Sequence, residues 1–145
     1  MDLYAEQIVD LSKNPLNRGA LANASLAHSG VNTTCGDHVR LYLKVEDGKV
    51  KEISWEGDGC AISIAAVSVL TEEIKGKKLE DLINMKKEDL YEWLGIDHLG
   101  PARVKCVTLS LETLQGALKK TGKQLFKIIF VNSSALKKLN NFLVQ

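Results

Sequence analysis

The sequence contains few cysteines and prolines and has no long hydrophobic run. Its 145 residues include three cysteines and two prolines. An odd and small number of cysteines argues against a disulfide framework, so we expect buried packing groups, catalytic thiols or metal ligands. No apolar stretch approaches the length of a membrane span. The N-terminal MDLYAEQIVDLSKNP carries acidic residues and lacks the apolar region of a signal peptide. We therefore expect a cytoplasmic protein with no membrane partner.

An excess of charge of one sign is also missing. Lys plus Arg total 19 and Asp plus Glu total 18, which gives a formal net charge of +1. Such a balance provides no global basic field to attract nucleic acid, so we predict no nucleic-acid partner. The hydrophobic fraction of 45% is ordinary for a globular chain, and the length is sufficient for one domain with a buried core.

A β-hairpin is predicted in the stretch HVRLYLKVEDGKVKEISWEG, residues 38–57. Apolar and polar residues alternate along its first arm, which is the period of a strand with one buried face. Asp47-Gly48 between the two arms is a strong hairpin signal. The preceding residues 14–34 are rich in Asn, Ser, Gly and Ala, and we expect them to form a long, partly extended segment.

The remaining segments have helical spacing of their apolar residues. We expect helices over 4–13, from about 60 to Gly76, one or two short ones within 79–94, one from Ala102 to about Lys120, and a short amphipathic one capped by Ser133 or Ser134. The order predicts an α+β fold in a single domain, with a small antiparallel sheet of about three strands packed against several helices.

The stretch NTTCGDHVRL places a thiol and a carboxylate two positions apart. On extended backbone, residues i and i+2 point to the same side, so Cys35 and Asp37 can face one point in space. Gly36 between them has no side chain that would block an ion or a partner.

The other two cysteines are expected at helix starts. Cys60 follows Asp58-Gly59 where a helix begins, and a helix N-terminus should lower the pKa of its thiol. Cys106 lies early in the last long helix, near Arg103 and Lys105, and we expect these cations to favour its thiolate. Arg103 is a candidate auxiliary residue that could steady a persulfide or a substrate carboxylate; the alternative is an ordinary solvated charge.

Three thiolates and one carboxylate are the right number of ligands for a four-coordinate site. Soft thiolates select zinc or iron–sulfur chemistry over magnesium or calcium. The alternative is that each cysteine is a buried packing residue and that Asp37 only makes a turn. The spacings match no short zinc-finger pattern. The three histidines are weaker candidates, because hydrogen-bonded surface histidines are common: His28, His38 and His98.

Four short motifs occur in a specific order along the chain: YAEQIVDLSKNPLNRG, then CGD, then DGCAIS, then ARVKCVTLSLETL. This set closely resembles the IscU/SufU/NifU N-terminal-like family of iron–sulfur cluster assembly scaffold proteins. The likeness runs from Tyr4 to about Leu118, which suggests a scaffold domain at 1–120 and a C-terminal extension at 121–145. The resemblance implies that zinc or a [2Fe–2S] cluster is bound by four residues: Cys35, Asp37, Cys60 and Cys106.

The resemblance also implies a function. A scaffold of this family accepts sulfur from a cysteine desulfurase, builds a labile [2Fe–2S] cluster and transfers it to acceptor apoproteins. The alternative is a zinc-dependent, SufU-like sulfurtransferase that takes up persulfide sulfur from the desulfurase, with Cys35 as the candidate sulfur acceptor in either case. A purely structural zinc domain is a third possibility, but Asp37 counts against it because closed structural sites favour thiolate and imidazole ligands.

The chain departs from both types within the family. Lys105 stands where IscU-type members have histidine, and LGPARVK replaces the LPPVK chaperone-binding motif, which counts against binding of the dedicated Hsp70 chaperone. The missing histidine favours a sulfurtransferase. The stretch between Cys60 and Cys106 is too short for the insertion of SufU-type chains, which favours a scaffold, and we adopt the scaffold as the leading hypothesis.

Overall fold

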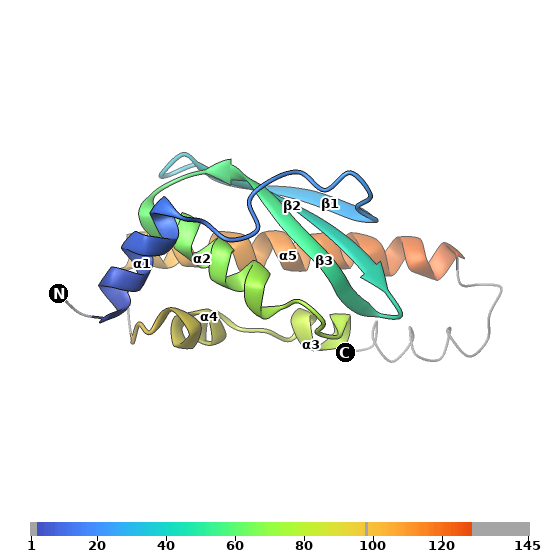
Figure 1. Ribbon diagram of the computed structural model, residues 1–145. Helices are drawn as coiled ribbons and strands as arrows, with labels where there is room; N and C mark the ends of the chain where they lie inside the picture. The colour runs from blue at the N-terminus through green and yellow to red at the C-terminus, as the bar shows by residue number, and fades with distance from the viewer. Residues whose placement is uncertain (1–2, 98, 129–145) are drawn as a thin grey trace.

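A computed structural model describes residues 3–97 and 99–128 of the chain, with the side chains of 6–97 and 99–120 (Figure 1). This part of the chain forms five helices and three strands. In chain order they are α1 (Leu3–Lys13), β1 (Leu26–Asn32), β2 (Asp37–Glu46), β3 (Lys49–Asp58), α2 (Ala61–Glu73), α3 (Leu79–Ile83), α4 (Lys87–Leu94) and α5 (Pro101–Ile128).

The three strands form one antiparallel sheet in the order β1-β2-β3. The predicted hairpin is confirmed as β2 and β3, and both residues of its turn have positive φ, 52° at Asp47 and 72° at Gly48. The third strand, β1, comes from the segment that was expected to be partly extended. Because Asn32 pairs with Asp37, the end of β1, the start of β2 and the end of β3 meet at the same end of the sheet.

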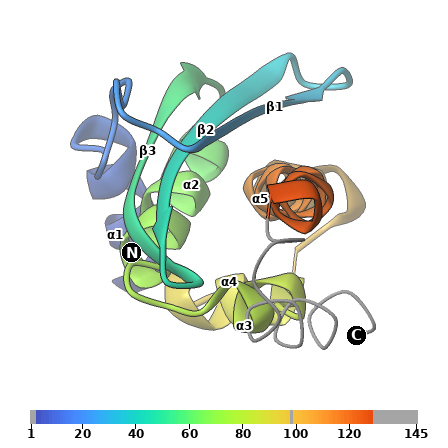
Figure 2. The same cartoon turned by 90° about the vertical axis from the view of Figure 1, so that its right-hand side faces the viewer.

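Helices α2 and α5 lie side by side under one face of the sheet, and the short helices α3 and α4 lie beyond them (Figures 1 and 2). The strand alternation explains this layering, since Val39, Leu41 and Leu43 are buried while their neighbours on β2 are exposed or half-buried. The predicted α+β architecture, with a small sheet packed on several helices, is confirmed.

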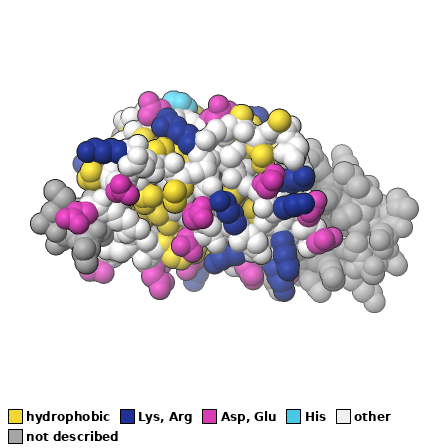
Figure 3. Space-filling model, viewed as in Figure 1, with side chains coloured by type: hydrophobic (Ala, Val, Ile, Leu, Met, Phe, Trp, Pro, Cys, Tyr) yellow, Lys and Arg dark blue, Asp and Glu magenta, His cyan; other side chains and the backbone are white. Residues whose placement is uncertain are grey.

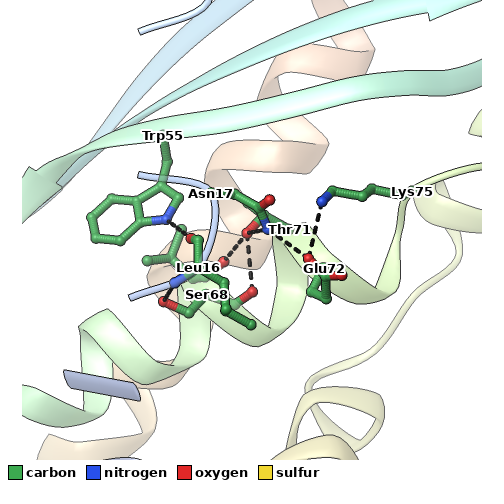
Figure 4. A network of polar contacts seen from close by, with 8 residues as sticks. Leu16, Asn17, Trp55, Ser68, Thr71, Glu72 and Lys75 are labelled. Carbon is green, nitrogen blue, oxygen red and sulfur yellow. Dashed lines mark hydrogen bonds and ion pairs between the residues drawn. The ribbon is translucent and has the colours of Figure 1, made fainter. Parts of the chain in front are cut away.

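The segment that follows α1 is attached to both β3 and α2 by polar contacts (Figure 4). The Trp55 indole donates to the Leu16 carbonyl at 2.8 Å, and the Leu16 N–H donates to the Ser68 hydroxyl at 3.2 Å. The Asn17 amide donates to the Thr71 hydroxyl at 3.1 Å. These bonds fix α2 against β3, and therefore fix the beginning of α2 close to the end of β3.

Helix α5 is longer than its spacing of apolar residues predicted. It continues to Ile128, whereas the expected end was near Lys120, so it runs into the segment treated as a C-terminal extension. The helix expected after Ser133 or Ser134, and His98, lie outside the described residues. Within the described residues, no helix is long and apolar enough to cross a membrane. Acidic and basic side chains are interspersed over the face in Figure 3, as the balanced composition suggests.

Strand β1 packs closely on α5 because two glycines remove side chains from the contact. A Cβ at Gly30 would overlap the Thr113 hydroxyl, and a Cβ at Gly116 would lie 2.7 Å from Nε2 of His28. The distance between this strand and this helix is therefore set by residues that have no side chain.

We predict that Gly30→Ala destabilises the fold by about 1–3 kcal/mol, because the new methyl group has to displace Thr113 from a packed contact. Thermal or urea unfolding monitored by circular dichroism measures the change. The companion variant Gly30→Ala/Thr113→Ala removes the overlapping hydroxyl and should recover part of the loss. A Gly30→Ala protein as stable as the wild type would show that β1 and α5 can separate freely.

Candidate metal centre

The four predicted ligand residues come from four segments that meet at one end of the sheet. Cys35 lies in the turn between β1 and β2, and Asp37 is the first residue of β2. Cys60 is the N-cap residue of α2, and Cys106 lies in the second turn of α5. Residues far apart in the sequence are thus brought together by the hairpin and by the parallel placement of α2 and α5 under it.

Three of these side chains form a compact group. The ligand atoms of Cys35, Asp37 and Cys106 all lie within 4.8 Å of one another, a separation that one metal ion can bridge. Cys60 adjoins the group: its N–H donates to Asp37 at 3.1 Å, and its thiol interacts with the Cys106 thiol. The structure brings the four side chains together, and their role as ligands remains a prediction.

The carboxylate of Asp37 is buried and held at both oxygens. Its Oδ1 accepts from the Cys60 N–H, and its Oδ2 accepts from the Ser63 hydroxyl at 2.7 Å. Asp37 is only 2% exposed. Gly59 makes room for it, since a Cβ at that position would lie 2.7 Å from Oδ1. The first turn of α2 therefore binds a carboxylate that belongs to β2.

Ser63 was not identified as a site residue from the sequence. Its hydroxyl lies 2.7 Å from Asp37 Oδ2, 3.5 Å from the Cys60 sulfur and 3.3 Å from the Cys106 carbonyl oxygen. The available signal was a polar residue at the third position of a helix whose first seven residues are otherwise apolar. Serine near a helix start is common, however, so that signal could not be distinguished from ordinary capping.

The pKa of the Cys60 thiol lies below its usual range. Burial alone would raise this pKa, but the Ser63 hydroxyl beside the sulfur, the Ser63 backbone N–H and the hydrogen bond with the Cys106 thiol outweigh that effect. The Ser63 N–H is one of the unpaired donors at the start of α2. The predicted lowering by a helix N-terminus is therefore confirmed in direction, with Ser63 as its main agent.

The expectation for Cys106 was wrong. Burial, together with the nearby Cys60, Cys35 and Asp37, raises the pKa of its thiol to about 12. Cys106 is 3% exposed, whereas Arg103 and Lys105 lie on the exposed side of α5. Solvated cations have little influence on a buried thiol that faces other anionic groups.

The exposed Cys35 is held in place by a buried asparagine that was also missed in the sequence. The Asn32 carbonyl accepts from the Gly36 N–H at 2.8 Å, and the Asn32 side-chain oxygen accepts from the Thr34 N–H at 3.2 Å. Gly36 has φ of 73°, a conformation that glycine adopts without strain. The turn thus presents Cys35 to solvent on a defined backbone.

The remaining candidates do not join this group within the described residues. No described histidine belongs to the cluster of possible ligands, and His38 is exposed on the opposite side of β2 from Asp37. Arg103 lies one turn before Cys106 and is exposed. Its auxiliary role therefore stays a prediction.

The donor set fits a thiophilic metal. Three thiols and one carboxylate supply four ligand atoms, and thiolate-rich sites bind zinc or iron–sulfur clusters in preference to hard cations. Both oxygens of the carboxylate already accept protein hydrogen bonds, so it would be the weakest of the four ligands.

We predict a clear order of alkylation by iodoacetamide in the metal-free protein. Cys35 should react readily because it is exposed, and Cys106 should react more than about 100-fold more slowly at pH 8, because a pKa near 12 leaves little thiolate. The rate at Cys60 should level off at a lower pH than that of a free cysteine, since its pKa is lowered.

Mass-spectrometric peptide mapping after short pulses at several pH values measures these rates. Urea-unfolded protein is the control, in which all three cysteines should react alike. Labelling of Cys106 as fast as Cys35 in the folded protein would contradict the burial described above.

Comparison with known proteins identifies the family. Residues 3–127 match the family described as the NifU-like N terminal domain, and the chain belongs to this family. The match extends beyond Leu118, where the resemblance seen in the sequence ended, and covers most of α5.

Relatives with two different names are similar to this chain. The iron–sulfur cluster assembly scaffold protein IscU of Thermotoga maritima is 37% identical over 136 residues, covering 83% of this chain and 96% of the relative. The zinc-dependent sulfurtransferase SufU of Bacillus subtilis is 38% identical over 137 residues, covering 83% and 92%. These nearly equal identities do not distinguish between the two activities.

A solved structure has the same fold. It is the crystal structure of a putative iron–sulfur cluster assembly scaffold protein for the SUF system from Fervidobacterium islandicum, with a TM-score of 0.65 and 32% sequence identity. The match covers 78% of this chain and 94% of that one.

Proposed function

We propose that this protein is an iron–sulfur cluster assembly scaffold. It accepts sulfur from a cysteine desulfurase, builds a labile [2Fe–2S] cluster and transfers it to acceptor apoproteins. The observation that carries the proposal is the compact group of Cys35, Asp37 and Cys106, with Cys60 adjoining it. The family relationship supports the same reading, because a scaffold protein is among its close relatives.

The site is suited to holding cargo and then releasing it. A [2Fe–2S] cluster needs four protein ligands, two for each iron, and Cys35, Asp37, Cys60 and Cys106 are sufficient in number. A carboxylate is a poorer ligand for a soft site than a thiolate, so Asp37 is the natural point of release.

A zinc-dependent sulfurtransferase is the second candidate, and the exposure of Cys35 favours it. The Cys35 thiolate would attack the outer sulfur of a donor persulfide, break its S–S bond and release the donor thiolate, leaving a persulfide on Cys35. Bound zinc would stabilise the thiolate forms of the remaining cysteines. Lys105 in place of histidine points the same way, and Arg103 could steady the incoming persulfide.

Partners and location are part of the proposal. We infer a cysteine desulfurase as sulfur donor, apoproteins as acceptors, and the cytoplasm as the compartment. The absence of the LPPVK motif counts against the dedicated Hsp70 chaperone. We retain residues 1–120 as the scaffold domain, and 121–145 as an extension whose first residues continue α5.

Anaerobic reconstitution tests the proposed function. Zinc-free protein is incubated with ferrous iron, cysteine, a cysteine desulfurase and dithiothreitol, the thiol reductant that converts persulfide sulfur to sulfide. Visible absorption and Mössbauer spectra are then recorded. We predict a [2Fe–2S] signature that passes to an apo-ferredoxin, although Lys105 cannot act as a ligand while protonated.

The outcome that rejects the scaffold is equally specific. A protein that forms only persulfide, excludes iron and stimulates the desulfurase solely in its zinc form is a sulfurtransferase. Lys105→His is the companion variant. If a histidine at this position is the missing determinant, this change alone should convert the zinc form into a protein that holds a cluster.

Asp37→Ala should keep its cargo and transfer it at least several-fold more slowly to an acceptor apoprotein, because the remaining thiolates bind more tightly than a carboxylate. Transfer is followed by the visible absorption of the acceptor. Asp58→Ala is a matched control, since it removes an exposed carboxylate nearby that lies outside the group. Loss of cargo as complete as in Cys60→Ser would make Asp37 an ordinary structural ligand.

A further inference from the structure

The Ser63 hydroxyl contacts three groups of the site: the Asp37 carboxylate, the Cys60 sulfur and the Cys106 carbonyl oxygen. It lies in the first turn of α2, is 9% exposed, and donates to Asp37 Oδ2 at 2.7 Å. We propose that Ser63 is a positioning residue that weakens the bond between Asp37 and a bound metal. Its hydroxyl donates a hydrogen bond to the carboxylate, and this hydrogen bond competes with coordination of the metal. This inference rests on the proposed function only in taking Asp37 as a ligand.

Two hydrogen-bond donors at the start of α2 hold the Asp37 carboxylate. The Cys60 N–H bonds Oδ1 and the Ser63 hydroxyl bonds Oδ2, so each oxygen has one protein donor. The positive end of the helix dipole favours a carboxylate at this position. Donors that stabilise a carboxylate reduce the charge it offers to a metal, so each of them competes with the metal for the same group.

The hydroxyl has one proton, and geometry assigns it to Asp37. The alternative acceptors for that proton are farther away: the Cys106 carbonyl oxygen lies at 3.3 Å and the Cys60 sulfur at 3.5 Å. The bond is also held firmly in position. Helix α2 is tied to β3 through Asn17 and Ser68, and Gly59 leaves the carboxylate its space.

This role predicts an effect opposite in sign to that of a structural role. If Ser63 only held the site together, removing its hydroxyl would loosen the ligands and speed metal loss. If the hydroxyl competes with the metal, its removal strengthens the bond between Asp37 and the metal and slows metal loss, even though the metal-free protein becomes less stable because the buried Asp37 carboxylate loses one of its donors.

The experiment measures the release of zinc from the loaded full-length protein to an excess of a chromogenic chelator. Ser63→Ala should release zinc about five-fold more slowly than the wild type, the effect of one hydrogen bond of ordinary strength. Ser63→Thr keeps the hydroxyl and should restore the wild-type rate. In the Asp37→Ala background, Ser63→Ala should leave the rate unchanged.

Ser68→Ala is the matched control, because it removes another buried hydroxyl of α2, one that accepts from the Leu16 N–H and does not touch Asp37. It should lower the melting temperature without slowing release. Absorption spectra of the cobalt(II)-substituted proteins check the ligand set, and Ser63→Ala should keep the intensity of tetrahedral coordination.

Faster or unchanged release from Ser63→Ala overturns the proposal, as does loss of the tetrahedral cobalt(II) spectrum, which would mean that Ser63 holds Asp37 on the metal. The same effect of Ser63→Ala with and without Asp37 overturns it too. None of these results depends on a desulfurase or on iron, so the inference can fail while cluster assembly succeeds, and the reverse.

Discussion

The interaction on which the rest of the site depends is the capture of the Asp37 carboxylate by the first turn of α2. A helix start needs acceptors for its unpaired N–H groups, and the N-cap residue, Cys60, makes no side-chain cap of its own. A carboxylate from β2 serves in its place. One pair of hydrogen bonds thereby joins the sheet to the helix and brings Cys60 to the group that contains Cys35. The same bonds offset the free-energy cost of burying the charged Asp37 carboxylate.

The rest of the fold keeps these segments at a fixed separation. Gly30 and Gly116 set the distance between β1 and α5, and the bonds from Asn17 and Leu16 set α2 against β3. The site is therefore built from segments that also hold one another through direct contacts. A metal would add a further tie between the turn, α2 and α5, and its binding free energy would add to the stability of the fold.

Local patterns predicted much of this arrangement, and non-local packing decided the remainder. Alternation and Asp47-Gly48 predicted the hairpin because strand period and turn chemistry are properties of neighbouring residues. The pKa of Cys106 was predicted in the wrong direction, because its environment is set by burial against other segments and not by the adjacent Lys105. Ser63 and Asn32 were missed for the same reason: a hydrogen bond between distant segments leaves no periodic trace in the sequence.

The order of the segments along the chain has a consequence for synthesis. Cys35, Asp37 and Cys60 lie in the first half of the sequence, but Cys106 is carried by α5, the last described helix. A nascent chain emerging from the ribosome thus exposes an incomplete ligand set until α5 has been made and has packed beneath the sheet. Completion of the ligand set is in this way coupled to the synthesis of nearly the whole domain. A partly made chain lacks Cys106, the fourth ligand, and therefore cannot bind a metal as the finished protein would.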